Sequence, residues 1–138
     1  MSIEVNQQLA VALFYQVVDR EDFELADRIL SPDFASYFPA SAQPMDREGL
    51  KRFIKSFHAA FPDGYHEIDE TLCIADRIVV RYTARGTHQG EYLGVSPTRN
   101  RVTITGISIY RVRDNQIVEE YGEGDLLGLM AQLGAAGH

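Results

Sequence analysis

An aspartate near the end of the chain, Asp125, stands where an apolar strand gives way to an apolar helix. It follows the flexible stretch Gly122-Glu123-Gly124 and precedes Leu126-Leu127. Two interpretations fit this position. Asp is among the best N-cap residues, so it can begin the helix without any ligand. A carboxylate between an apolar strand and an apolar helix also loses hydration, and it can then exchange protons near neutral pH as a general acid or base.

A second candidate is His88, which the alternation that starts at Ile78 places on an apolar strand face near the strand end. Such a histidine is either a satisfied core residue or a group that positions or polarises a substrate carbonyl. Phenol groups can donate hydrogen bonds in the same pocket, although buried tyrosines commonly only anchor themselves. These candidates for substrate contact are Tyr15, Tyr110 and Tyr121.

The remaining ionisable residues are expected to be structural. His58 and His66 fit the edge of the core, and the pair Glu119-Glu120 points to opposite faces, so at most one of the two can enter a cavity. The four histidines show no HxH or HExxH spacing, and Cys73 is the only cysteine, so we expect neither a metal site nor a disulfide.

Composition and charge argue against some classes of binding partner. The 138 residues predict a single domain, 1–138, and the formal net charge of −7 argues against a nucleic-acid partner. No apolar run is long enough to span a bilayer, and the N-terminus lacks the features of a secretory signal. We therefore expect a cytoplasmic protein. No serine stands in a G-x-S-x-G context, and no glycine-rich phosphate loop occurs.

Helical patterns fill the first half of the chain. Apolar residues at helical spacing predict a first helix through Leu9 and Val17, Asp22 is suited to cap a second that stops near Pro32, and Asp46 is suited to cap a third. The third helix is expected to bury Phe57 and to end at Pro62-Asp63-Gly64. A short extended segment, 34–38, is expected between the second and third helices.

From Tyr65 onward the period changes to two. Strands are expected over 65–74, 78–88, 101–113 and 117–124, and a short helix over 126–133. His66, Ile68, Leu72 and Ile74 should share one face of the first. In the third, Gly106 is expected to break the phase as a bulge would, so that Ile107 and Ile109 take over the inner face. The fold class is α+β, with three N-terminal helices on a curved antiparallel sheet whose cone-shaped interior can hold a small molecule.

Two stretches resemble a known family. The sequence G86-T-H-Q-G-E-Y-L-G94, followed by Ser96-Pro97-Thr98, looks like the "GTHxGxFxG…PT" signature of SnoaL-like polyketide cyclases, also called ester cyclases. The ending Ile117-Val118-Glu119-Glu120-Tyr121…Asp125 resembles the family's "I-x-E-H-W-x-x-x-D". This resemblance implies the cone-shaped α+β barrel of nuclear transport factor 2 and ketosteroid isomerase, usually as a homodimer.

The resemblance also implies a reaction. In such cyclases the aspartate that matches Asp125 is the acid/base of an intramolecular aldol condensation, which closes a polyketide ring without metal or cofactor. The position that aligns with a histidine of some cyclases is Ser108, and Tyr121 and Glu120 replace the usual Trp and His. We thus expect a cofactor-independent cyclase or isomerase acting on a hydrophobic small molecule, with Asp125 catalytic and with His88, Tyr121, Ser108, Tyr110, Tyr15 and Phe57 contacting the substrate.

Two other functions stay open. The same cavity can belong to a non-catalytic binding protein, or to another enzyme of this fold such as a ketosteroid-isomerase-like enzyme or an epoxide hydrolase. Epoxide hydrolysis in this fold needs a polar water-activating cluster, so Arg81 or Arg101 would have to reach inside beside Asp125. The strand phase disfavours that arrangement.

Overall fold

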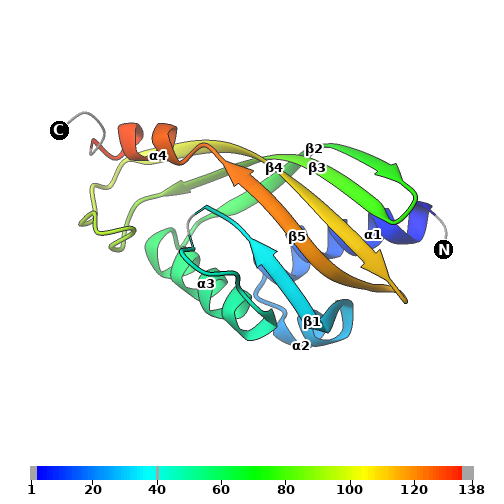
Figure 1. The fold of residues 1–138 in the computed structure, drawn as a ribbon. Coiled ribbons are helices and arrows are strands. Elements are labelled where there is room, and N and C mark those ends of the chain that lie inside the picture. Colours follow the sequence, from blue (N-terminus) through cyan, green and yellow to red (C-terminus); the bar gives the residue numbers. More distant parts are fainter. Residues whose placement is uncertain (1–2, 40, 135–138) are drawn as a thin grey trace.

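A computed structural model of the chain describes residues 3–39 and 41–134, and Figure 1 shows its arrangement. The helices are α1 (Ile3–Ala12), which continues as the π-helix η1 (Leu13–Val18), then α2 (Phe23–Ile29), α3 (Arg47–Ala60) and α4 (Leu126–Gln132). The strands are β1 (Leu30–Tyr37), β2 (Tyr65–Ile74), β3 (Arg77–Thr87), β4 (Arg101–Arg113) and β5 (Gln116–Gly124).

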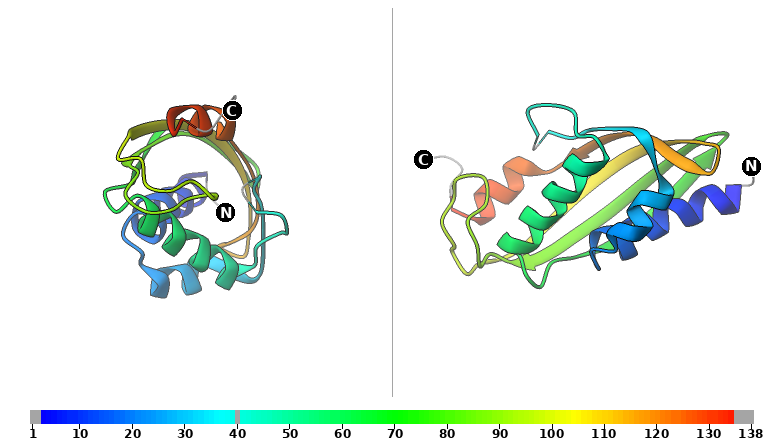
Figure 2. Two further views of the ribbon diagram at one scale, coloured as in Figure 1. Left: turned by 90° about the vertical axis from the view of Figure 1, so that its left-hand side faces the viewer. Right: turned by 90° about the horizontal axis from the view of Figure 1, so that it is seen from below.

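The five strands form one curved sheet in the order β1-β5-β4-β3-β2. The sheet curls around one side of the molecule and α1, α2 and α3 close the other side (Figure 2), so the expected α+β class and cone shape are confirmed. The expectation of a wholly antiparallel sheet is wrong in one respect. The extended segment after α2 is a full edge strand, β1, and it pairs parallel to β5. An edge strand tolerates Pro32, which has no N–H to donate.

Aspartates begin the second and third helices, as the sequence predicts. The carboxylate of Asp22 accepts a hydrogen bond from the backbone N–H of Leu25 at 3.1 Å, and that of Asp46 accepts one from Gly49 at 2.7 Å. Each bond satisfies a donor that the first helical turn leaves unpaired. The main core then forms between these helices and the inner face of the sheet.

The phase of β2 changes at a bulge. Ile68 pairs with Tyr82 but Glu70 pairs with Arg81, so one extra residue, Asp69, stands between them. The expectation that Leu72 and Ile74 share the face of His66 is therefore wrong, because the bulge turns both outward and leaves them 55% and 75% exposed.

The phase of β4, in contrast, is unbroken at Gly106. Gly106 pairs with Tyr82 in a continuous register, and Ser108 and Tyr110 keep to the buried face. The predicted bulge is wrong, and Ile107 and Ile109 lie exposed on the outer face. Gly106 instead makes space, since a Cβ there would collide with the phenol of Tyr82.

The short helix α4 lies beside the part of β4 that does not pair with β5. The pairing of β4 with β5 begins at Gly106, so the first residues of β4 have no strand on that side. The side-chain amide of Gln132 fills the place by accepting from the N–H of Thr103 and donating to its carbonyl, both at 2.8 Å. These two hydrogen bonds hold α4 against β4 at one end of the cone.

The contact between Gly106 and Tyr82 gives the first prediction. Gly106→Ala should lower the free energy of unfolding by about 1–3 kcal/mol, because the added methyl group forces the Tyr82 ring to move. Urea unfolding followed by circular dichroism measures this change. The control Thr105→Ala, at an exposed neighbouring position, should cost less than about 1 kcal/mol. Equal costs for the two variants would contradict this account.

Candidate functional site: an apolar cavity with a histidine–aspartate pair

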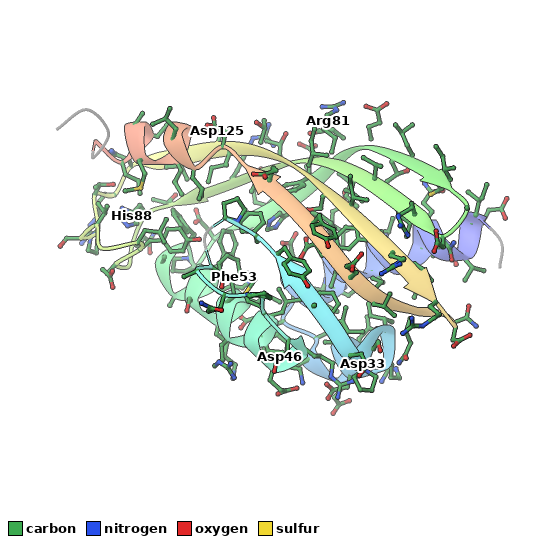
Figure 3. All side chains as sticks on the ribbon, viewed as in Figure 1. Asp33, Asp46, Phe53, Arg81, His88 and Asp125 are labelled. Atoms are coloured by element: carbon green, nitrogen blue, oxygen red, sulfur yellow. The ribbon has the colours of Figure 1, made fainter. Side chains whose placement is uncertain are left out.

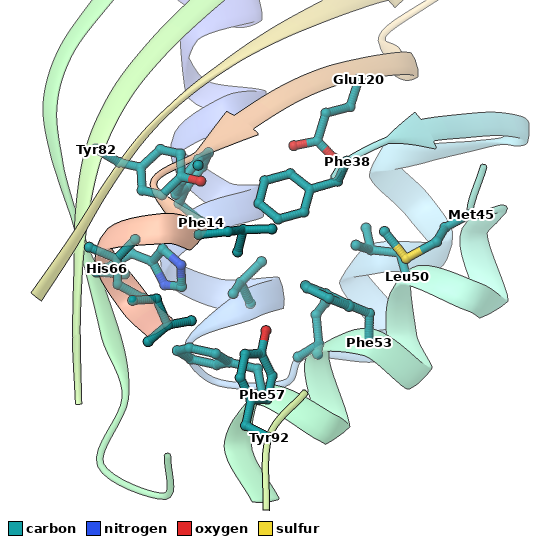
Figure 4. Close-up of a pocket in the computed structure, with 17 residues that line it drawn as sticks. Phe14, Phe38, Met45, Leu50, Phe53, Phe57, His66, Tyr82, Tyr92 and Glu120 are labelled. Carbon is teal, nitrogen blue, oxygen red and sulfur yellow. The ribbon is translucent and has the colours of Figure 1, made fainter. Parts of the chain in front are cut away.

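An apolar cavity lies between the helices and the inner face of the sheet. The space open to the centres of water-sized molecules is ≈ 120 Å³. Aromatic and aliphatic side chains from both layers surround it, and Figure 4 shows them: Phe14, Val18, Phe38, Met45, Leu50, Phe53, Ile54, Phe57, His66, Tyr82, Ala84, Tyr92, Ile104, Glu120, Gly124, Leu126 and Leu129. Apolar clefts and cavities with a few polar groups are typical of small-molecule binding sites.

Small residues on the sheet create the room. A Cβ on Gly122 would lie 2.6 Å from a ring carbon of Phe38, and one on Gly124 would lie 3.2 Å from the same ring. The Phe38 ring can therefore pack closely against β5, where a larger side chain at either glycine would force it to move. Ala84 leaves similar room beside its cross-strand partner, His66.

Four polar side chains reach this cavity, namely His66, Tyr82, Tyr92 and Glu120. The imidazole of His66 projects inward from β2, while the carboxylate of Glu120 and the hydroxyl of Tyr82 point toward one another (Figure 4). Tyr92 enters from the loop that joins β3 to β4. Any proton transfer inside the cavity has to use one of these groups, a bound water or the ligand itself.

Asp19 holds His66 at two points. Its Oδ2 accepts from the backbone N–H of His66 at 2.8 Å, and its Oδ1 contacts the ring Nδ1 at 2.7 Å. The two side chains are only 13% and 14% exposed. Because an ionised carboxylate can only accept, Nδ1 carries a proton and donates it to Asp19, and in the neutral ring Nε2 is then the nitrogen with the lone pair.

The position of Asp19 follows from the π-helix. The N–H of Asp19 donates to the carbonyl of Phe14, five residues back, at 3.1 Å. On α3, Nε2 of His58 lies 2.7 Å from the carbonyl of Val18, so it donates to a carbonyl at the end of the π-helix. Single π-helical turns frequently occur at functional sites. Here the turn places Asp19 opposite the first residues of β2.

Glu120 is anchored on the opposite wall. One carboxylate oxygen accepts from the hydroxyl of Ser36 at 2.6 Å and the other accepts from the hydroxyl of Tyr110 at 2.9 Å. Its neighbour Glu119 turns outward and pairs with Arg111 at 3.2 Å. The prediction that at most one of this pair enters the cavity is confirmed.

The expected surroundings of Asp125 are wrong. Its carboxylate is exposed, and it does not line the cavity; it caps α4 by accepting from the N–H of Gly128 at 2.8 Å. Figure 3 places Asp125 where β5 leads into α4, apart from Phe53, which lines the cavity from α3. The capping interpretation therefore accounts for this residue, and the dehydration on which the acid/base interpretation depends does not occur.

The cluster needed for epoxide hydrolysis does not form either. Arg81 is half-exposed on the outer face, where its guanidinium pairs with Glu70 at 3.2 Å and lies 3.7 Å from Asp69. Arg101 is likewise exposed. Neither arginine lines the cavity.

His88 is fully buried but outside the cavity. The N–H of Thr98 donates to its Nδ1 at 3.1 Å, and the Thr98 hydroxyl lies at the same distance. The backbone of His88 also bonds to Asn100 and Arg99. These contacts tie the two ends of the loop that carries Tyr92, so His88 is a core residue. It is not a fully satisfied one, because its buried Nε2 has no hydrogen-bond partner among the described residues.

The other predicted contact residues divide into three groups. Phe57 lines the cavity. Tyr110 and Ser108 are buried behind the wall, with Tyr110 supporting Glu120. Tyr15 and Tyr121 lie outside: the Tyr15 oxygen accepts from the N–H of Ile68, and Tyr121 stacks on Tyr37 with ring centroids 4.8 Å apart. Their predicted place in the pocket is wrong, because both side chains are on exposed faces.

Within the described ranges, no three His, Cys, Asp or Glu side chains gather closely enough to bind a metal ion. None of the helices in this part of the chain has the length and apolarity needed to span a bilayer.

The sequence profile of the SnoaL-like polyketide cyclase family matches residues 8–133. The chain belongs to this family. A comparison with proteins of curated function found no match.

Solved structures agree with this assignment. The fold is similar to that of IdmH, a candidate polyketide cyclase from Streptomyces antibioticus, with 30% identity, a TM-score of 0.84, and coverage of 94% of this chain and 98% of that one. TsrD from Streptomyces laurentii is 27% identical, with a TM-score of 0.87 and 98% coverage of both chains. AclR, a candidate hydroxylase from Streptomyces galilaeus, is 26% identical, with a TM-score of 0.86 and coverage of 99% and 85%.

The cavity and the wall behind it give the second prediction. Burial, followed by the charge of Glu120, raises the pKa of Tyr82 and of Tyr110, and burial raises the pKa of Tyr92. In an alkaline absorbance titration, the tyrosinate signal of these three of the seven tyrosines should develop well above pH of about 10, where a free phenol ionises. Because these pKa values are raised by folding, the stability they contribute is complete below that pH and is lost as the pH rises through the raised values.

Glu120→Gln supplies the control for this titration. Removing the charge should lower the pKa of Tyr82 and Tyr110 while leaving that of Tyr92, whose pKa is raised by burial alone. A single titration of all seven tyrosines in the folded wild-type protein would contradict the described burial.

Proposed function

We propose that this protein is a cyclase or isomerase that transfers a proton next to a carbonyl group of an apolar small molecule held in the cavity. The observation that supports this most is the cavity itself, which is lined almost wholly by apolar side chains and has ionisable groups on two facing walls. Membership of the SnoaL-like polyketide cyclase family supports the same class of reaction.

The proposed reaction is an intramolecular aldol ring closure. A base removes a proton from a carbon between two carbonyl groups, and the enolate carbon attacks a ketone carbon of the same molecule. One carbon–carbon bond forms, and the ketone oxygen becomes a hydroxyl by taking up one proton, so the substrate and product have the same composition. An apolar lining favours this step because water would compete for the enolate and screen the charges around it.

A ring-closure assay tests the proposal. The probe is an aryl ketone whose ortho substituent carries a β-keto ester, placed so that closure gives a six-membered ring. The wild-type protein should accelerate closure about 10²–10⁴-fold over buffer, the range expected for positioned acid/base catalysis. No acceleration by the folded wild-type protein would contradict the proposed function.

A variant that fills the cavity tests whether ring closure takes place there. Ala84→Leu places extra volume on the inner face of β3 and should reduce the acceleration at least about tenfold, because the probe loses its space. Thr105→Leu adds comparable bulk at an exposed position outside the cavity and should retain the wild-type rate. Equal rates for the two variants would place the reaction elsewhere.

We also propose that the protein is a homodimer. The outer face of β1, β5 and β4 carries exposed apolar side chains, Tyr37, Ile107, Ile109 and Tyr121, which border one shallow hollow together with residues of the segments 38–39 and 41–44. A contiguous exposed apolar patch of this kind favours association with a second copy.

Light scattering during size-exclusion chromatography measures the predicted dimer. The wild-type protein should elute at twice the 15.5 kDa chain mass, and Ile109→Glu should elute as a monomer, because the charge would be buried without a partner. Leu72→Glu, on the exposed edge strand β2, is the matched control and should remain dimeric. A monomeric wild-type protein would contradict the proposal.

A further inference from the structure

The group placed to remove the proton must present an unpartnered acceptor to the cavity. Each oxygen of Glu120 is already held by one hydroxyl donor, Ser36 or Tyr110, and so keeps only part of its acceptor capacity for a ligand. The phenols of Tyr82 and Tyr92 hold their protons, because burial raises the pKa of each. Nε2 of His66 has no hydrogen-bond partner within residues 3–39 and 41–134, and the ring that carries it lines the cavity.

The contact with Asp19 fixes how this lone pair is presented. A carboxylate with only one bond to the ring could swing aside, but Asp19 is also held by the backbone N–H of His66. The imidazole is thus fixed both in tautomer and in direction, with Nδ1–H toward Asp19 and Nε2 away from it. The negative charge of Asp19 also stands beside the ring on which a positive charge would develop.

Three aromatic rings surround the imidazole. The ring centroid of His66 lies 5.7 Å from that of Phe14, 5.5 Å from that of Phe57 and 5.6 Å from that of Tyr82. Two of these rings come from the helical layer, on η1 and α3, and the third comes from β3 of the sheet. A base confined in this way loses little orientational freedom when a substrate enters.

We propose that Nε2 of His66 is the general base of this site, with Asp19 as its positioning residue. This inference rests on the proposed function, because it names the group that takes the proton from the activated carbon. The proton moves from that carbon to Nε2, the enolate forms the new carbon–carbon bond, and the proton then passes from the imidazolium to the alkoxide, directly or through water. Glu120, held by two donors on the facing wall, accepts a hydrogen bond from a hydroxyl or phenol of the ligand.

Two variants test the pair with the ring-closure probe. His66→Gln should lower kcat about 10²–10⁴-fold with little change in KM, because the base is lost and the cavity remains. Asp19→Asn keeps the shape of the side chain but donates from its amide, so the ring proton moves to Nε2 and the free lone pair is lost. Its kcat should fall about 10²-fold.

Nitrogen-15 NMR of the histidine rings separates a chemical role of Asp19 from a structural one. In the wild-type protein the His66 signals should show a protonated Nδ1 and a bare Nε2. In Asp19→Asn they should show a bare Nδ1 and a protonated Nε2. Circular dichroism checks that each variant is folded. If His66→Gln does not fold, the rate and the tautomer of Asp19→Asn decide the question.

Asp125→Asn is the matched control. Asn caps helices as well as Asp does, so α4 should persist, and the rate should stay within about twofold of the wild type. Wild-type kcat in His66→Gln, or a large loss in Asp125→Asn, would overturn the assignment of the base while leaving the proposed function in place. A wild-type protein that closes no ring would instead remove the proposed function.

Discussion

The carboxylate of Asp19 holds His66 by its backbone and by its ring, and this contact joins three parts of the fold. Asp19 follows the π-helix, His66 is the second residue of β2, and His58 of α3 binds the carbonyl at the end of the π-helix. Without the π-helical turn, the chain after Val18 would leave the helix at a different angle, and the carboxylate would not face β2. The polar centre of the cavity therefore depends on a local irregularity of the first helix.

The shape of the cavity depends on a second constraint: small residues on the strands leave room for large side chains that pack against them. Gly106 makes room for Tyr82, and Gly122 makes room for Phe38, so aromatic rings lie along the inner face of the sheet. Ala84 leaves space beside His66. Because these small residues come from β3, β4 and β5, the hollow extends across the sheet, with α3 closing it opposite.

Sequence patterns predicted the helices, the four later strands and the helix caps, because each depends on local periodicity or on a single side-chain bond. They failed where a neighbour far along the chain decides the outcome. The bulge at Asp69 reversed the phase of Leu72 and Ile74, and the predicted break at Gly106 proved to be space for Tyr82. The sequence did not single out His66 and Glu120 as site residues. Asp19, the partner of His66, and Ser36, one partner of Glu120, lie far away along the chain, and only Tyr110 is near Glu120 in sequence. The one available signal was an ionisable residue on each of two strands, His66 near the start of β2 and Glu120 in the middle of β5.

The position of a bound product tests the central claim most directly. A crystal structure of the protein soaked with the cyclised probe should place the product in the cavity. Its quaternary hydroxyl-bearing carbon and the adjoining ester-bearing carbon should lie against His66, with Nε2 within about 3.5 Å of the reacting atoms. A product bound beside Asp125 on the outer surface, with the cavity empty, would contradict both the site and its base.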